Sequence, residues 1–115
     1  MHYLIGAGKL SIYEDIQRQT LEHEKTYPND FTARAAIEEY VANVSRTLGT
    51  WVVLRSTRDG SAGHWSIHET PEDAHRCANG VHPVTAPGVI LGPDGTAYHM
   101  PGAPLDRFLA MVRRA

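Results

Sequence analysis

The chain has 115 residues, of which 42% are hydrophobic and 21% are charged, and its formal net charge is −2. These values are typical of one soluble globular domain, so we predict a single domain over residues 1–115. The balanced charge excludes the basic surface that nucleic-acid binding requires. The longest apolar runs, such as residues 51–54, are far shorter than the roughly 20 residues of a membrane-spanning helix. We therefore expect neither a nucleic-acid partner nor a membrane partner.

The N-terminal residues carry neither the basic segment nor the cleavage pattern of a secretory signal, so we expect a cytoplasmic protein. Cys77 is the one cysteine of the chain. A single cysteine excludes an intramolecular disulfide and a Cys-x-x-Cys redox or zinc pair. Folding stability is therefore expected to come from the burial of apolar side chains.

The first fifty residues are predicted to form two helices. Residues 2–5 allow a short strand, and Ser11 followed three residues later by Glu14 matches a capping box, which predicts a helix over residues 12–24. The segment Gly6-Ala7-Gly8-Lys9 lacks the spacing of a phosphate-binding loop, so we interpret it as a flexible lead into this helix. A second helix is predicted to begin at Asn29 or Asp30 and to end at Gly49. Its apolar stripe consists of Ala33, Ala36, Ile37, Tyr40, Val41, Val44 and Leu48.

The rest of the chain is predicted to form two hairpins, each followed by a helix. Residues 51–56 are apolar at odd and at even positions, except at their end, which indicates a strand that is buried on both faces. Residues 64–68 alternate, with Trp65 and Ile67 on one face and the polar side chains on the other. A proline after Thr70 predicts a short helix over 71–79. A second hairpin over 89–100 and a final helix over 104–114 complete the chain.

The predicted fold class is α+β, with an antiparallel sheet of about four strands, in two β-hairpins, packed by about four helices. The predicted element order is helix, helix, hairpin, helix, hairpin, helix. This order leaves 25–32 and 81–88 as the longer connections. Little sequence then remains for an active-site lid.

Histidine is the candidate metal ligand in this sequence, which contains seven histidines. His64 and His68 lie about 13 Å apart along one strand, too far to share one ion. A strand end and the following helix can converge, so a metal site formed by His68, His75 and His82, with Glu69 nearby, stays open. Such a site would make the protein a metal-dependent hydrolase, and we treat this as the alternative function.

No arrangement for nucleophilic catalysis is readable, and no catalytic residue and no cofactor are predicted. Cys77 falls on the inner face of the predicted helix 71–79, which favours a core thiol over a reactive one. The pairs of neighbouring carboxylates lie on predicted helices beside solvent, where the helix dipole accounts for two of them. We therefore lean towards a protein that is not an enzyme.

The C-terminal segment resembles a known family. Residues 85–91, the turn Pro93-Asp94-Gly95, Gly102 and the helix 104–114 are similar to the last strand, turn, strand and helix of thioredoxin-like domains, with Pro87 at the position of that family's cis-proline. The resemblance implies a thioredoxin-like scaffold. Since the chain lacks a Cys-x-x-Cys motif, such a scaffold would be redox-inactive and used for binding. The hairpin over 51–68 departs from the strand-helix-strand order that the family has before this segment.

The function predicted from the sequence is a small non-catalytic protein-binding or regulatory module. Its partner is expected to be another protein, a second copy of itself, or both. The predicted contact surface is the sheet face that carries Arg55, His64, Ser66 and His68, because arginine and histidine are favoured over lysine at interfaces. An apolar face with Trp51 and Val53, which one small core would leave uncovered, is the reason to expect self-association.

Overall fold

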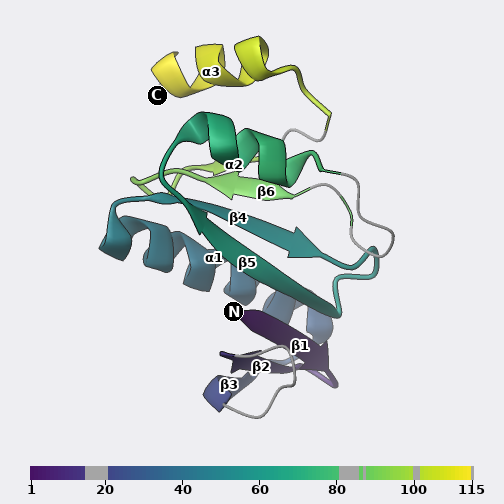
Figure 1. The fold of residues 1–115 in the computed structure, drawn as a ribbon. Helices are drawn as coiled ribbons and strands as arrows, with labels where there is room; N and C mark the ends of the chain where they lie inside the picture. The colour runs from purple at the N-terminus through teal and green to yellow at the C-terminus, as the bar shows by residue number, and fades with distance from the viewer. Residues whose placement is uncertain (15–20, 81–85, 87, 100–101, 115) are drawn as a thin grey trace.

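Seven strands and three helices appear in the computed structural model, which describes residues 1–14, 21–80, 86, 88–99 and 102–114 (Figure 1). The elements are β1 (His2–Gly6), β2 (Lys9–Tyr13), β3 (Leu21–Thr26), α1 (Asp30–Leu48), β4 (Trp51–Ser56), β5 (Ala62–His68), α2 (Pro71–Ala78), β6 (Val89–Leu91), β7 (Ala97–Tyr98) and α3 (Leu105–Arg114). The strands form one antiparallel sheet in the order β3-β2-β1-β5-β4-β6-β7. Among the described residues, no helix combines the length and the apolar character needed to cross a membrane.

The predicted count of about four strands and four helices is wrong, although the α+β class and the antiparallel pairing agree with the structure. The three additional strands are β1, over the residues that allowed a short strand, and β2 and β3, which overlap the ends of the predicted helix over 12–24. In β2, Leu10 and Ile12 alternate with polar neighbours and are almost completely buried. Ser11 between them is also buried, as a strand with neighbours on both sides and a helix on one face requires, and this pairing outweighs the capping pattern of Ser11 and Glu14.

The glycine segment before β2 is a hairpin turn and not a flexible lead. Ala7 and Gly8 both have positive φ, at 51° and 76°, as the tight two-residue turns between antiparallel strands require. The Gly8 N–H donates to the Asp30 carboxylate at 2.6 Å, and the Gly8 carbonyl accepts from the Tyr27 N–H at 2.7 Å. This turn therefore anchors the start of α1 to the β1-β2 hairpin.

The other predicted elements are confirmed with small shifts of their ends. Asn29 caps α1 through its side chain, which accepts from the Thr32 N–H at 2.8 Å, and Gly49 ends the helix in a left-handed conformation. The hydroxyl of Thr70 caps α2, with Pro71 in its first turn. These ends were predictable because the capping groups lie next to the backbone donors they satisfy.

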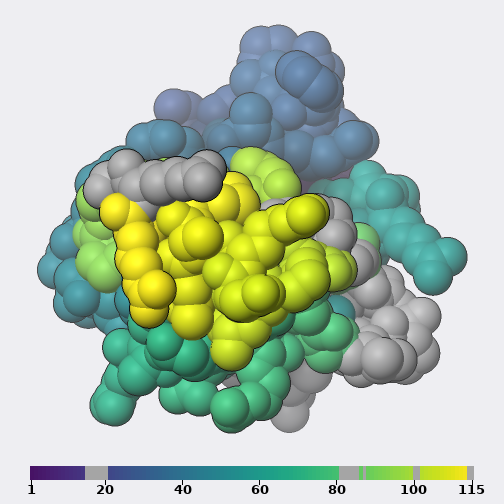
Figure 2. Space-filling model, turned by 90° about the horizontal axis from the view of Figure 1, so that it is seen from above, coloured from purple at the N-terminus to yellow at the C-terminus, as the bar shows by residue number. Residues whose placement is uncertain are grey.

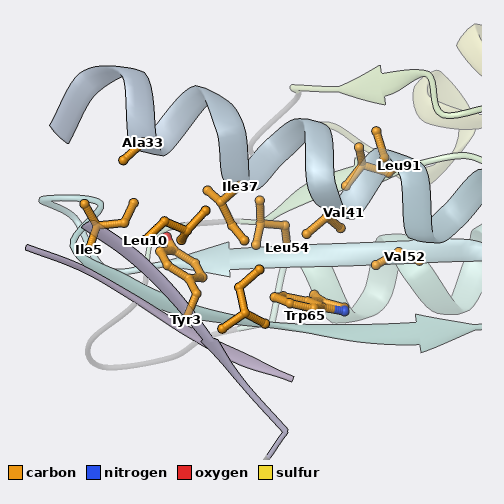
Figure 3. Packing of buried hydrophobic residues seen from close by; sticks show 12 residues of the cluster. Tyr3, Ile5, Leu10, Ala33, Ile37, Val41, Val52, Leu54, Trp65 and Leu91 are labelled. Carbon is orange, nitrogen blue, oxygen red and sulfur yellow. The ribbon is translucent and has the colours of Figure 1, made fainter. Parts of the chain in front are cut away.

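Helices cover the sheet on both faces (Figure 1). Helix α1 packs on one face, and the side chains between it and the sheet point towards one another (Figure 3). Helix α2 packs on the opposite face of β4, β5 and β6, and α3 lies over α2 (Figure 2). The core under α1 consists of Tyr3, Ile5, Leu10, Ile12, Ala33, Ile37, Val41, Ala42, Val52, Leu54, Trp65 and Leu91. The second core consists of Val53, Ala74, Ala78, Ile90, Tyr98 and Phe108.

The β4-β5 turn is held by one carboxylate. The Oδ1 atom of Asp59 accepts from the Ser61 N–H at 3.0 Å, the Ser61 hydroxyl at 2.8 Å and the Thr57 hydroxyl at 2.7 Å. These hydrogen bonds, first of all that from the Ser61 backbone, lower the pKa of Asp59 from 3.8 to about 2. The ionised carboxylate is therefore the form that the folded turn favours.

Substitution of Gly8 by alanine is expected to destabilise the fold. A Cβ atom at this position would clash with the Tyr27 carbonyl, and φ is already positive. We expect Gly8→Ala to lower the free energy of unfolding by roughly 2–4 kcal/mol, as measured by urea denaturation. Gly49→Ala is the matched control, since its φ is also positive but a Cβ there meets nothing within 4 Å. A loss of about 1 kcal/mol is expected for the control, and equal losses in both variants would contradict the clash.

Asp59 is expected to contribute to the pH dependence of folding stability. Because its folded pKa is lowered to about 2 from 3.8, its contribution is present above pH 3.8 and is lost as the pH falls from 3.8 to about 2. Asp59→Asn should therefore show a shallower loss of stability over this acidic range than the parent chain. Urea denaturation at several pH values measures it, and identical slopes for the two proteins would contradict the assignment.

Candidate functional site

The four residues predicted to form a contact surface lie on the sheet face that α2 covers. Arg55 pairs with His64 across β4 and β5, and the same register places Ser66 opposite Val53 and His68 opposite Trp51. The alternation predicted from the sequence is therefore correct, because all four side chains share one face. That face is not open along its whole length, since α2 packs on β4 and β5 there.

Arg55 is a buried structural residue with only 5% of its surface exposed. Its guanidinium donates to the carbonyls of Cys77 at 2.6 Å, Ala78 at 3.1 Å and Gly80 at 2.9 Å. The last carbonyls of a helix lack partners within the helix and carry the negative end of its dipole. Arg55 thus holds the C-terminal end of α2 against β4, and this buried guanidinium is not presented to a partner.

Ser66 lies between an imidazole and a thiol. Its hydroxyl is 2.8 Å from His68 Nε2 and 3.5 Å from Cys77 Sγ. All three side chains are half-buried between β5 and α2. A hydroxyl beside an imidazole is a component of acyl-transfer sites, but those sites also need donors for the oxyanion of the reaction intermediate. In the described part of the chain, the Ser66 hydroxyl contacts His68 and Cys77 and so connects β5 with α2.

The predicted metal ligands are engaged with different partners. His68 is hydrogen-bonded to Ser66, whereas His75 Nε2 lies 2.6 Å from the Ala103 carbonyl oxygen and its ring stacks on Phe108 at 5.5 Å. His82 lies outside the described residues. Within the described part of the chain, no group of three or more His, Cys, Asp or Glu side chains is placed to hold a metal ion.

The apolar face with Trp51 and Val53 is covered. Val53 is fully buried, and the Trp51 ring lies 6.1 Å from Phe108 of α3 and 6.2 Å from Tyr98. The C-terminal helix supplies this cover by folding back over α2 and β7 (Figure 2). The expectation of uncovered apolar surface at this place was therefore wrong.

A furrow beside α1 is the feature that the sequence did not predict. Two hollows, of about 400 Å³ and about 240 Å³, neighbour each other along α1, and Tyr40 and Asn43 line both. The Tyr40 ring lies 5.3 Å from the ring of His23 on β3 and 5.9 Å from that of Trp65 on β5. We call the two hollows together the α1 furrow; their lining is Leu10, His23, Lys25, Tyr27, Ala36, Glu39, Tyr40, Asn43, Val44, Thr47 and Leu48.

Two large apolar side chains are exposed on the α1 side of the sheet, and one of them, Leu48, lines the α1 furrow. Leu48 is 55% exposed, and so is Ile67, which lies opposite Val52 and therefore on the α1 face of the sheet. Strand β1 pairs with β5 only at residues 62–64, so the last residues of β5 project past it. The stripe of α1 is wider than the surface it buries, and this width was the signal in the sequence that could have indicated the furrow.

Comparison with known proteins does not add to these observations, since no protein-family model, curated protein or solved structure matches the chain. The strand, turn, strand and helix that resemble thioredoxin-like domains are present as β6, β7 and α3. Pro87, the residue that would decide whether this resemblance holds, lies outside the described residues.

Loss of Arg55 is expected to detach the end of α2 from the sheet. Arg55→Met removes three hydrogen bonds from a charged donor, although the Cys77 and Ala78 carbonyls keep the Gly80 and Gly88 N–H groups as donors. The loss of the three charged hydrogen bonds should lower the free energy of unfolding by about 2–4 kcal/mol. Arg76→Met is the matched control, because Arg76 is an exposed arginine of α2 that pairs with Asp73 at the surface. Its effect should stay within about 0.5 kcal/mol in thermal or urea denaturation. Equal effects of the two substitutions would contradict a structural role for Arg55.

Proposed function

We propose that this protein is a non-catalytic protein-binding module whose docking surface is the α1 furrow. The observation that carries the proposal is the 55% exposure of Leu48, which lines the hollow together with Tyr40 and Val44, and the equal exposure of Ile67 on the face of the sheet that α1 covers. Large apolar side chains grouped on one face of a small domain mark contact surfaces more often than isolated ones do. Aromatic residues such as Tyr40 are also enriched at such surfaces.

The shape of the furrow favours a protein over a small molecule. It follows α1 from Ala36 to Leu48, a rise of about 18 Å along the helix axis. This length suits a segment of a folded partner that packs along the helix. Charges of both signs border it, with Lys25 on β3 and the exposed Glu39–Arg46 ion pair, at 3.1 Å, on α1. The mixed charge does not favour an anionic polymer such as nucleic acid.

A second copy of the chain is the partner that we propose. In a two-fold dimer the same surface of both copies forms the interface. An apolar patch on one copy would therefore meet the same apolar patch on the other. The furrow replaces the face with Arg55, His64, Ser66 and His68 as the proposed contact surface, because Arg55 is buried against α2. It also replaces the covered Trp51 face as the reason to expect self-association.

A charge placed at Leu48 or at Ile67 should weaken self-association. We expect the parent chain to sediment as a dimer, and Leu48→Glu and Ile67→Glu to weaken dimerisation by roughly tenfold or more, because each would bury an unpaired carboxylate. Both side chains are already about half exposed, so the variants should stay folded by circular dichroism. Sedimentation equilibrium over a range of protein concentrations measures the effect.

Phe31→Glu is the control for this experiment. Phe31 is 77% exposed and lies in the first turn of the same helix, but it does not line the furrow. Its substitution should leave dimerisation unchanged. A parent chain that stays monomeric at every concentration would overturn the proposed dimer, and a dimer that only Phe31→Glu weakens would overturn the assigned surface.

A further inference from the structure

The two histidines His2 and His64 face each other across neighbouring strands. Their pairing register is His2 with His64, and the backbone bonds on either side are Trp65 N–H to the Met1 carbonyl and Ile5 N–H to the Ser61 carbonyl. Hydrogen-bonded and non-hydrogen-bonded pairs alternate along an antiparallel ladder, so His2 and His64 form a non-hydrogen-bonded pair. This is the position at which cross-strand side chains approach most closely.

The separation of the two imidazoles allows both to bind one metal ion. Their ring centroids are 5.7 Å apart, with 41° between the ring planes, and both residues are half-buried. If each ring nitrogen lay about 2.0–2.1 Å from one tetrahedral ion, the ring centroids would stand about 5–6 Å apart. The strands already hold the rings at that separation.

We propose that His2 and His64 form a binding site for a divalent transition-metal ion of the zinc, nickel and copper group. Imidazole nitrogen is a preferred ligand of these ions, whereas calcium and magnesium prefer oxygen. The two histidines provide two ligands, and water occupies the remaining coordination positions. A two-histidine site of this kind binds more weakly than a structural zinc site with four protein ligands.

The neighbouring groups in the same cross-strand row are compatible with a cation. Tyr13 lies next to His2 in the register, and its phenol oxygen is a further donor atom on this face. Arg55 lies on the other side of His64, but its guanidinium donates to the carbonyls at the end of α2. The positive charge of Arg55 is thereby offset by the negative end of that helix dipole.

The site is separate from the α1 furrow. His2 and His64 alternate with Tyr3 and Trp65, whose side chains belong to the core under α1, so the imidazoles lie on the opposite face of the sheet. It also differs from the site predicted from the sequence, which joined His68, His75 and His82. The metal proposal therefore does not depend on the proposed function.

Isothermal titration calorimetry of the chain without an affinity tag, with zinc chloride, tests the proposal. We expect one equivalent of Zn²⁺ to bind, and His2→Asn and His64→Asn each to weaken the affinity by more than roughly tenfold, because one of two ligands is lost. His99→Asn is the control, since His99 is exposed and pairs with Glu38. It should bind zinc as the parent chain does.

A measurement on the unsubstituted chain tests the site even if the variants fold poorly. Substoichiometric Cu²⁺ is paramagnetic, so it should broaden the NMR signals of the His2 and His64 rings before those of the other histidines. Absence of binding to the parent chain would overturn the proposal. Binding that survives both substitutions, or that is lost in His75→Asn instead, would also overturn it and would place the metal elsewhere.

Discussion

The structure depends on the burial of β4 on both faces of the sheet. Val52 and Leu54 enter the core under α1, whereas Val53 enters the core under α2 and α3. Arg55 follows them in the same strand and holds the end of α2 through three carbonyls. Because adjacent residues of one strand serve opposite layers, neither layer can shift without disturbing the other.

The two faces of the sheet are covered to different extents, and this difference determines where function can lie. Helix α3, packed on α2, closes over Trp51 and Tyr98 through the aromatic contacts of Phe108. Helix α1 is a single long helix, and one flank of its apolar stripe extends past the side chains it buries. The α1 furrow is the result, and it leaves Leu48 and Ile67 half exposed while the polar face predicted to bind a partner is engaged by α2.

The histidines show how pairing between strands changes the chemistry that a sequence suggests. Neighbours in sequence, His64 and His68, are too far apart along β5 to act together. His75 is committed to Ala103 and Phe108. The imidazole that meets His64 is that of His2 in the N-terminal strand, far from His64 in the sequence, and no spacing rule could have joined them. Their contact depends on the register of β1 against β5.

Helices α1, α2 and α3 and the hairpins β4-β5 and β6-β7 could be predicted from the amino-acid sequence, because caps, turn residues and periodicity act within a few residues of one another. The same local signals placed Arg55, His64, Ser66 and His68 on one face. Strands over residues 9–13 and 21–26 could not be predicted in this way, since a strand is stabilised by partners distant in the chain. Which faces are covered also depends on long-range packing, because the burial of Arg55 and the exposure of Leu48 follow from how helices pack on the sheet.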